Sequence, residues 1–393
     1  MQAVLLAAGR GTRMRPLSAE RPKPMLPVAD RPLAAHAADA AVAAGVDELV
    51  LVVGYEGETL RSYFGDSYRS TPVEYAVQES TDGTADAVAA AADHLDGPFL
   101  VLNGDSIYDP DSVARLVESG PSLGVHEVDR PSNYGVVTLA DGTVESIVEK
   151  PDEPPTNLVN AGAYVFPAAA RDWLSVPTSD RGERELTDVL ATTIERTAVT
   201  PVELAEWLDV GRPWELLAAN ERRIGQQGRR LDGDVSESAR IVGDVVVEDG
   251  ATVGEGVVVE GPARIRAGAN VGPNAYVRAT TLVGRGATVG HAAEVKNSLL
   301  MAGANVAHLS SISDSVIGRD VDVGAGMTVA NLRHDEEPVR LDVKGEPVST
   351  GRREFGAVVG DRAKTGIDTS LSAGVKLSAG ATTAPGETVV RDR

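Results

Sequence analysis

The segment VEDGATVGEGVVVEGPARIRAGANVGPNAYV (residues 247–277) places an aliphatic side chain at every sixth position. A period of six fits no amphipathic helix, whose apolar positions recur every three to four residues. The same spacing runs unbroken through Val235, Ile241, Val247, Val253, Val259, Ile265, Val271, Val277, Val283, Val289 and Val295, and it resumes at Val359, Thr365, Leu371, Leu377, Thr383 and Val389. We therefore predict a β-solenoid of six-residue units, each of which buries one side chain in a column.

The repeat is interrupted by NLRHDEEPVRLDVKGEPVSTGRREFG (residues 331–356). Long insertions in a solenoid tend to lie on its working face, so we expect this loop to border a site. The repeats resemble the left-handed parallel β-helices of the hexapeptide acyltransferase superfamily. The resemblance implies a left-handed β-helix of hexapeptide repeats and a homotrimer.

The residues before the solenoid follow a different pattern, in which short apolar runs alternate with helical segments. Strands are expected at 3–7, 48–54, 72–77 and 98–105, and helices at 32–45 and 84–95. This alternation predicts a Rossmann-like α/β domain with a largely parallel sheet and a ligand at the carboxyl ends of its strands. With an arginine-rich link at 221–230, we expect one domain over residues 1–225 and a second over 226–393.

The composition narrows the function classes. The net charge is −21, only six lysines occur and there is no cysteine. Disulfides, thiolate metal sites and a cysteine nucleophile are excluded, and so strong an acidic balance argues against nucleic acid or an anionic membrane as a partner. No apolar run approaches the ~18 residues that span a bilayer, so we expect a cytoplasmic protein. Its acid-rich, lysine-poor composition suggests a halophilic source, because molar salt shortens the Debye length to ~3 Å.

One loop departs from this acidic balance. Residues 10–31 hold Arg10, Arg13, Arg15, Arg21, Lys23 and Arg31 against only two carboxylates. A dinucleotide-binding loop is excluded, because its third glycine would fall at Met14 and prolines forbid the helix that should follow. A phosphate-binding P-loop is excluded too, since no Gly-Lys-Ser/Thr occurs. What remains is an open glycine loop whose backbone N–H groups and cations predict an anion site.

The pattern LAAGRGTRMRPLS…RPKPMLP resembles the nucleotidyltransferases that join a sugar 1-phosphate to a nucleoside triphosphate. The likeness continues through QESTDGTADA (78–87), LNGDSIY (102–108), NYGVV (133–137), VEKP (148–151), NAGAYVF (160–166), ELTD (185–188) and WLDVG (207–211). Such enzymes mainly position the reactants and neutralise phosphate charge, which suits arginine and lysine.

The resemblance assigns roles residue by residue. It implies that Arg13 and Lys23 are catalytic and that Asp105 and Asp209 hold Mg²⁺, which prefers one or two carboxylates plus phosphate oxygens. The implied nucleotide-binding residues are Ala7, Gly9, Gly11, Gln78, Gly83 and Thr84, and the implied sugar-binding residues are Gly135, Glu149, Lys150 and Asn160. Asp209 is typical of thymidylyl-type enzymes, so the choice between UTP and dTTP stays open.

In the solenoid, EVKN (294–297), VAHLSS (306–311), DVDVGAG (320–326) and MTVANL (327–332) resemble the acetyltransferase half of the enzymes that make UDP-N-acetylglucosamine. The resemblance implies acetyl-CoA as co-substrate, Arg278, Lys296 and Asn331 as ligands of the acetyl acceptor, and His308 as catalytic base. An imidazole, with an ordinary pKa near ~6.5, suits deprotonation of an amine. Ser311, Asp322 and Leu332 replace bacterial tyrosine, asparagine and tyrosine, while the interrupting loop is more similar to archaeal members.

Three functions remain open at this point. The first is a bifunctional enzyme that acetylates glucosamine 1-phosphate and makes UDP-N-acetylglucosamine and pyrophosphate, with galactosamine 1-phosphate as another acceptor. The second is a glucose-1-phosphate thymidylyl- or uridylyltransferase whose β-helix is only an oligomerisation scaffold. The third is a non-catalytic sensor of nucleotide sugars, against which the set Arg13, Lys23, Asp105 and Asp209 argues. His308 with Lys296 and Arg278 discriminates between the first two.

Overall fold

The computed structural model describes residues 1–54, 56–79, 83–179 and 182–393. By its contacts the chain divides into two compact units. The first comprises Met1–Arg10, Arg21–Leu26 and Arg31–Val210, and the second comprises Gly11–Glu20, Pro27–Asp30 and Gly211–Arg393. The boundary at residue 225 stays a prediction, and each unit is described by itself.

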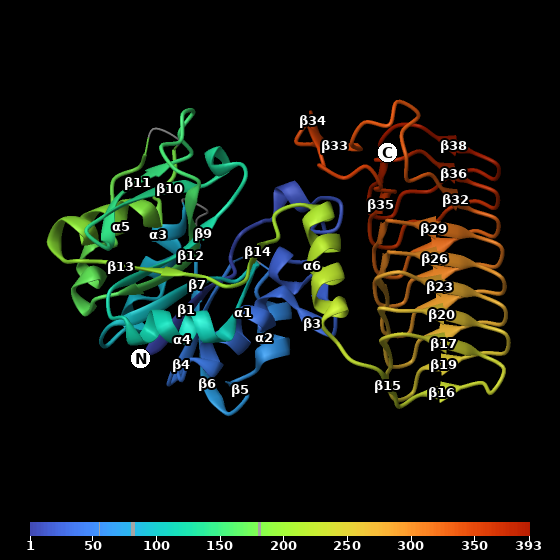
Figure 1. The fold of residues 1–393 in the computed structure, drawn as a ribbon, viewed down its shortest axis with the longest axis horizontal. Coiled ribbons are helices and arrows are strands. Elements are labelled where there is room, and N and C mark those ends of the chain that lie inside the picture. The colour runs from blue at the N-terminus through green and yellow to red at the C-terminus, as the bar shows by residue number, and fades with distance from the viewer. Residues whose placement is uncertain (55, 80–82, 180–181) are drawn as a thin grey trace. The chain divides into compact units, whose positions relative to one another are not determined.

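The first unit is built on a mixed sheet with a parallel centre (Figure 1). Strands β7 (Phe99–Asn103), β1 (Gln2–Leu6), β4 (Glu48–Val53) and β6 (Thr71–Val77) lie side by side and run parallel, so all four expected strands are confirmed. The remaining strands of this sheet are β5 (Ser67–Tyr68), β9 (Ser122–Glu127), β10 (Gly135–Ala140), β11 (Thr143–Glu149), β12 (Leu158–Phe166) and β13 (Thr200–Glu203). Three short strands of this unit fall outside the sheet, β3 (Arg31–Pro32), β8 (Ser106–Tyr108) and β14 (Trp207–Asp209), and β2 (Pro27–Val28) belongs to the second unit.

Helices cover both faces of this sheet, as expected for parallel strands with buried apolar runs. One face packs against α1 (Leu33–Ala43), α2 (Glu58–Phe64) and α4 (Pro110–Glu118), and the other against α3 (Thr84–Ala90) and α5 (Leu186–Arg196). Successive strand residues point to opposite faces. Leu5 therefore belongs to the first core and Val4 to the second, and both are fully buried. Within the described residues, no helix combines the length and apolarity that a membrane crossing demands.

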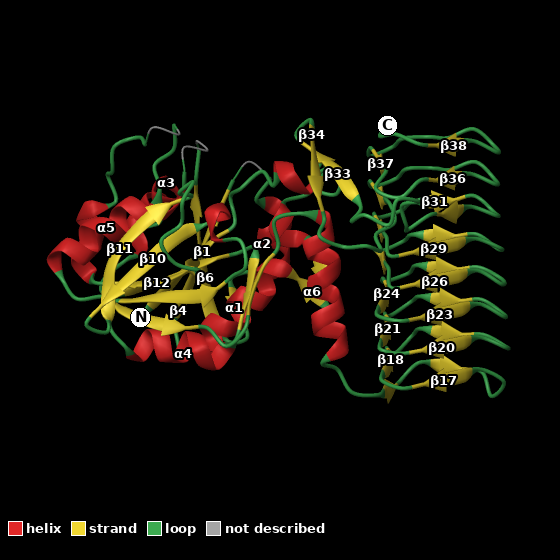
Figure 2. Cartoon of the chain, turned by 45° about the horizontal axis from the view of Figure 1, so that its top comes forward, coloured by secondary structure: helices red, strands yellow, loops and turns green. Residues whose placement is uncertain are grey.

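The second unit contains α6 (Pro213–Gly225) and a parallel β-helix with three faces (Figure 2). Its first sheet contains β15 (Arg230–Leu231), β18 (Val245–Val247), β21 (Ala263–Ile265), β24 (Thr281–Val283), β27 (Leu299–Leu300), β30 (Val316–Ile317), β35 (Val358–Val359) and β37 (Lys376–Leu377). Its second contains β16 (Asp234–Val235), β19 (Thr252–Val253), β22 (Asn270–Val271), β25 (Thr288–Val289), β28 (Asn305–Val306) and β31 (Asp322–Val323). Its third contains β17 (Arg240–Val242), β20 (Val258–Glu260), β23 (Tyr276–Arg278), β26 (Glu294–Lys296), β29 (Ser311–Ser313), β32 (Thr328–Val329), β36 (Ser370–Leu371) and β38 (Thr388–Val389).

The register explains the period of six. Val247 pairs with Ile265, and Ile265 pairs with Val283, so equivalent residues lie 18 positions apart in adjacent coils. Each coil therefore holds three six-residue units, one on each face. The side chains at these positions form one continuous core, in which Ile265 and Val283 are fully buried. The predicted column is confirmed.

The insertion interrupts the six-residue repeat in the sequence, but the sheets of the β-helix continue across it. Ile317 pairs with Val359, 42 positions away where 18 is the regular separation, an excess of 24 residues. The extra chain carries a hairpin of β33 (Arg340–Val343) and β34 (Glu346–Ser349). Val339 and Leu341 are buried, so the insertion has a small apolar anchor of its own.

Candidate functional site

The ends of the central strands bring several of the expected nucleotide-site residues to one edge of the sheet. Gly104 donates a backbone hydrogen bond to Leu6 at 2.9 Å, which places Asp105, just after β7, beside the end of β1. Ala7 in turn donates to Val52 of β4 at 2.9 Å. This edge, at the carboxyl ends of parallel strands, is where ligands of open α/β sheets bind.

Lys23 meets Asp105 at this edge. The Lys23 ammonium and an Asp105 carboxylate oxygen form an ion pair, and the Lys23 side chain is only 6% exposed against 33% for Asp105. Lys23 begins a single helical turn after Pro22, whose ring fixes the approach of the chain. A nearly buried ammonium needs such a partner, because an unpaired buried charge is costly. The pair thus holds a cation and a partly exposed carboxylate next to each other.

Asp209 lies close to Asp105 through the pairing of two short strands. Strand β14 (Trp207–Asp209) runs antiparallel to β8, with Asp209 opposite Ser106, and Val210 donates to the Asp105 carbonyl at 3.3 Å. Within the described ranges, no group of three or more His, Cys, Asp or Glu side chains is suited to a metal. Two neighbouring carboxylates nevertheless fit Mg²⁺, which completes its shell with phosphate oxygens and water.

Gln78, Gly83 and Thr84 come together around the start of α3. The Gln78 amide donates to the Gly83 carbonyl at 3.0 Å, and the Thr84 hydroxyl accepts from the Leu186 backbone at 2.9 Å. Gly83 has φ of 130°, and a Cβ there would lie 2.1 Å from the Arg184 carbonyl oxygen. Only glycine fits this position. Residues 80–82 of the QESTDGTADA motif lie outside the described residues.

Of the expected sugar-binding residues, Gly135, Glu149 and Asn160 lie on the adjacent strands β10, β11 and β12, and Lys150 directly follows β11. Gly135 is opposite Glu149, and a Cβ at Gly135 would stand 2.9 Å from a Glu149 carboxylate oxygen. Lys150 pairs with Glu149 at 2.7 Å. The Asn160 amide donates to the Tyr164 hydroxyl at 2.6 Å. Burial raises the pKa of Tyr164 well above its usual range although this hydrogen bond opposes the shift, so the phenol stays protonated.

Gly9, Gly11 and Arg13 belong to the basic loop. Gly9 is exposed, and a Cβ added there would meet no other atom within 4 Å. Gly11 has φ of 58°, in the left-handed region that suits glycine. Arg13 is exposed and belongs to the second unit, where its guanidinium lies 3.5 Å from the position that a Cβ on Gly211 would take. Gly211 ends the WLDVG motif, two residues after Asp209.

On the third face of the β-helix, the expected acceptor ligands Arg278 and Lys296 are direct neighbours. They occupy equivalent positions of the paired strands β23 and β26. Arg278 donates to Glu294 at 2.8 Å, and Lys296 binds Asp314 at 3.1 Å and also Glu354. Burial by itself would lower the pKa of Lys296, but the hydrogen bonds to Glu354 and Asp314 outweigh it and raise the pKa. Lys296 therefore remains a cation.

His308 occupies an exposed corner between β28 and β29, in the coil that stacks on that of Lys296. Its carbonyl accepts from Gly326 of the next coil at 3.1 Å, which fixes the corner. Asn331 follows β32 at the start of the insertion, and its amide donates to Asp314 at 2.6 Å. Of the replacements, Ser311 lies in β29, Asp322 accepts from Asn305 at 2.9 Å, and Leu332 is 47% exposed.

Three carboxylates of this region were not anticipated from the sequence. Glu294 and Glu354 are the partners of Arg278 and Lys296, and Asp314 binds both Lys296 and Asn331. A signal existed for Glu294, which lies within the EVKN motif beside Lys296. Asp314 lies 18 positions after Lys296, the length of one coil, so the repeat also carried a signal for it, whereas Glu354 belongs to the insertion and no spacing indicates it.

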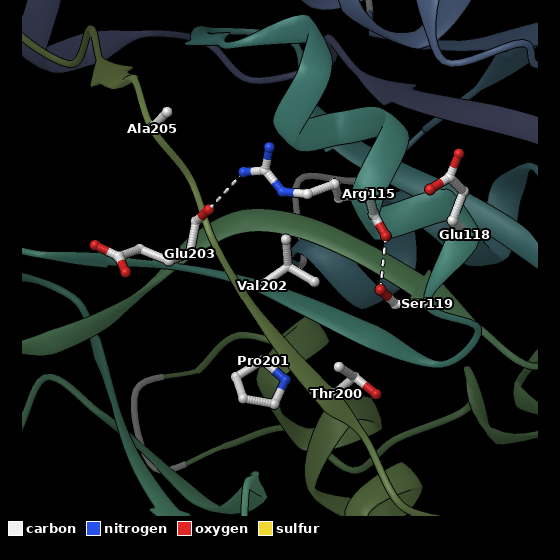
Figure 3. A pocket seen from close by; sticks show the side chains of 8 residues that line it. All are labelled: Arg115, Glu118, Ser119, Thr200, Pro201, Val202, Glu203 and Ala205. Carbon is white, nitrogen blue, oxygen red and sulfur yellow. Dashed lines mark hydrogen bonds between the residues drawn. The ribbon is translucent and has the colours of Figure 1, made fainter.

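A surface hollow of about 750 Å³ lies between α4 and β13 (Figure 3). Arg115 crosses its upper part and donates to the Glu203 carbonyl at 3.1 Å, while Glu118 and Glu203 extend two carboxylates (Figure 3). None of its lining residues is among those expected at a site. The ion pairs of the expected site residues, Lys23 with Asp105 and Lys296 with Asp314, lie elsewhere.

Comparison with known proteins places the chain in a family. The family model described as nucleotidyl transferase matches residues 2–224, and one described as GMPPB C-terminal domain matches residues 259–365. The "Bifunctional protein GlmU" of Methanococcus vannielii is 39% identical, over 96% of this chain and 92% of its own. The "Bifunctional sugar-1-phosphate nucleotidylyltransferase/acetyltransferase" of Sulfurisphaera tokodaii is 34% identical, over 100% of this chain and 98% of its own.

Among solved structures, a putative glucose-1-phosphate thymidylyltransferase from Bacillus anthracis is similar to the first part of the chain. It superposes with a TM-score of 0.53 and 27% identity, over 56% of this chain and 94% of its own. The match thus supports the α/β fold, while the two bifunctional relatives extend through the β-helix as well. The chain therefore belongs to the nucleotidyl transferase family, and within it to the bifunctional GlmU and sugar-1-phosphate nucleotidylyltransferase/acetyltransferase proteins.

Proposed function

We propose that this chain acetylates glucosamine 1-phosphate with acetyl-CoA and then transfers a uridylyl group from UTP to the product, N-acetylglucosamine 1-phosphate. The products are UDP-N-acetylglucosamine and pyrophosphate. The observation that carries the proposal is similarity to bifunctional relatives through both halves of the chain, over 96% and 100% of its length.

In the nucleotidyl transfer, an oxygen of the sugar phosphate attacks the α-phosphorus of the nucleotide and pyrophosphate leaves. Lys23 and Arg13 neutralise charge on the triphosphate, where an ammonium and a forked guanidinium complement each other. Asp105 and Asp209 are the residues that would hold Mg²⁺, which stabilises the developing phosphate charge. Because the nearly buried Lys23 is paired with Asp105, its ammonium is already oriented before the nucleotide arrives.

In the acetyl transfer, the amine of the acceptor attacks the thioester carbonyl and gives its proton to His308, the CoA thiolate leaves, and His308 passes the proton to it to form the CoA thiol. Arg278 and Lys296 bind the acceptor phosphate, for which their adjacency on β23 and β26 provides two cations side by side. Asn331 binds the amino sugar. The exposed position of His308 supports this role, because the base must reach a substrate that enters from solvent.

The experiment is a pair of assays on one preparation. Release of the CoA thiol is followed with acetyl-CoA and glucosamine 1-phosphate or galactosamine 1-phosphate, and release of pyrophosphate with UTP or dTTP and several sugar 1-phosphates. Both activities are expected, with UTP and N-acetylglucosamine 1-phosphate preferred in the second. Pyrophosphate release without any CoA release would leave a monofunctional enzyme with the β-helix as scaffold.

We also propose a homotrimer formed through the β-helix. Leu309 and Ile367, 62% and 55% exposed, belong to the corner that contains His308. Backbone bonds from Gly326 to His308 and from Asp368 to Ala325 stack the coils along that corner. Large apolar side chains exposed in one place favour coverage by another copy. Light scattering tests this, and a fully active monomer of 40.9 kDa would contradict it.

A further inference from the structure

Asp314 is a buried carboxylate that binds three side chains from two separate segments. It is only 2% exposed. One oxygen accepts from Lys296 at 3.1 Å and from Asn331 at 2.6 Å, and the other accepts from Asn297 at 2.8 Å. Burial of a charge is tolerated when the charge is paired and its lone pairs are satisfied, and all three contacts serve that purpose.

The backbone of Asp314 ties the same segments together. Its N–H donates to the Lys296 carbonyl at 2.9 Å, and its own carbonyl accepts from Gly356 at 2.8 Å. Phe355 then donates to the Asn331 carbonyl at 2.9 Å, which closes the insertion at its base. Asp314 thus joins the coil of Lys296 to both ends of the insertion, so neither Lys296 nor Asn331 can shift independently of it.

The carboxylate also fixes the orientation of both donors. A carboxylate only accepts, so the Asn331 amide must turn its NH₂ group toward Asp314 and cannot flip. Lys296 has a second carboxylate partner in Glu354, but the Glu354 side chain is 49% exposed. An exposed pair is weak and exchangeable, whereas the buried contact to Asp314 persists. An incoming phosphate can therefore replace Glu354 while Asp314 keeps the ammonium in place.

We infer that Asp314 is the positioning residue of the amino-sugar-phosphate site, holding the Lys296 ammonium and the Asn331 amide in the geometry that receives the acceptor. The inference rests on the proposed function, which gives Lys296 and Asn331 their acceptor-binding roles. Asp314 acts through these two side chains and takes no part in proton transfer. Its effect therefore belongs to acceptor binding rather than to the acetyl step or to nucleotide chemistry.

The test is Asp314→Asn in the full-length protein. The backbone of Asp314 has φ of 49°, a left-handed conformation that asparagine also tolerates, so the change removes the charge and not the turn. The NH₂ group of the new asparagine would be a hydrogen-bond donor placed against the donors of Lys296, Asn297 and Asn331. We expect KM for glucosamine 1-phosphate to rise at least about tenfold, with kcat within about threefold. KM for acetyl-CoA and the rate of nucleotidyl transfer stay unchanged.

Asp361→Asn is the matched control. Asp361 is equally buried, at 2%, and it accepts from the backbone and the guanidinium of Arg319 in the same β-helix. This variant should lose stability in the same way and leave the acceptor KM unchanged. A rise of the acceptor KM in both variants would mean that any buried carboxylate matters, and it would overturn the inference.

A double variant keeps the test sharp if Asp314→Asn does not fold. Asp314→Asn with Asn331→Asp exchanges the two ends of the 2.6 Å hydrogen bond and keeps one carboxylate and one amide. We expect a melting temperature near that of wild type and an acceptor KM raised beyond that of Asn331→Asp alone, because the carboxylate that binds Lys296 has been moved. Recovery of the wild-type KM would overturn the inference.

Failure of the proposed function is distinguishable from failure of this inference. A wild-type protein that releases no CoA thiol with either amino-sugar phosphate contradicts the proposed acetyl transfer, and the inference fails with it. A wild type that is active, beside a folded Asp314→Asn variant whose acceptor KM stays within about twofold, contradicts the inference alone.

Discussion

Replacement of Asp105 by asparagine separates the two halves of the chain most cleanly. The amide keeps the shape of the side chain but removes the charge expected to bind Mg²⁺ and to hold Lys23. We expect pyrophosphate release to fall by roughly 100-fold or more, the scale seen when an electrostatic contact to developing charge is lost, equivalent to about 3 kcal/mol in the barrier. CoA release should stay unchanged.

The same substitution has a calculable cost in stability. Lys23 is 6% exposed and would lose the negative partner of its ammonium, while Asp105, at 33%, is partly hydrated. Breaking a fully buried pair costs about 3–5 kcal/mol, so partial exposure reduces the expected loss to about 1–3 kcal/mol. For a domain of this size, that lowers the melting temperature by roughly 3–10 °C. A loss of activity measured well below the melting temperature is then catalytic.

The assay combines pyrophosphate release, CoA release and thermal unfolding on the same samples. Asp109→Asn is the matched control, since Asp109 caps α4 by accepting from Ser112 at 2.9 Å and asparagine caps as well. That variant should keep both activities. Pyrophosphate release within fivefold of wild type in Asp105→Asn would refute the metal-site reasoning, and equal loss of both activities would indicate unfolding instead.

Three further predictions concern other parts of the chain. His308→Ala should reduce CoA release by roughly 100-fold and leave pyrophosphate release intact, and unaltered CoA release would exclude His308 as the base. Gly83→Ala should raise KM for the nucleotide because its Cβ would strike Arg184, whereas Gly97→Ala, with open space around it, should be neutral; nucleotide titrations of both variants decide this. Burial by itself would raise the pKa of Glu248, but the hydrogen bond from the Ala267 N–H and the interactions with Arg266 and Arg264 outweigh it and hold this pKa below its usual range. The ionised Glu248 carboxylate therefore stabilises the fold above the unfolded-state pKa of ~4.3, and this contribution is lost as the pH falls and the carboxylate is protonated. Glu248→Gln should thus make the free energy of unfolding depend less on pH below about pH 4. Chemical denaturation that gives the same pH dependence for wild type and variant in this range would contradict the prediction.

The β-helix was predictable as far as its spacing stayed at six. Buried residues follow the predicted positions from Val247 to Val295, but the next are Leu300, Val306, Ile312 and Ile317, so the spacing falls to five at two places. The register absorbs both shortenings, since Leu282 pairs with Leu299 only 17 positions on. A corner that is one residue shorter leaves the column of buried side chains intact but interrupts the six-residue spacing in the sequence. Backbone pairing between coils, rather than periodicity, defines this stretch.

The candidate-site residues also differ in how far the sequence could predict their neighbours. Residues at strand ends, such as Asp105 beside Ala7, could be grouped from the sequence because parallel strands end at one edge of a sheet. The meeting of Gln78 with Gly83 also followed from a single motif. Asp314 follows Lys296 by 18 positions, one coil, but this signal shows only once the three-unit coil is known. The contact of Lys296 with Glu354 spans 58 positions and depends on how the insertion folds back, which no repeat spacing predicts.

The continuity of the sheets across the insertion makes the β-helix modular. Because Ile317 and Val359 stack as if they were consecutive, the length of the chain between them places no constraint on the repeat. Natural variation and protein engineering can therefore exchange the hairpin of β33 and β34 as a cassette, with Asn331 and Glu354 at the base of the insertion and the adjoining coils kept as fixed connectors. Lys344 and Gly345, at the exposed tip of the hairpin, mark where foreign sequence enters with least disturbance of the scaffold.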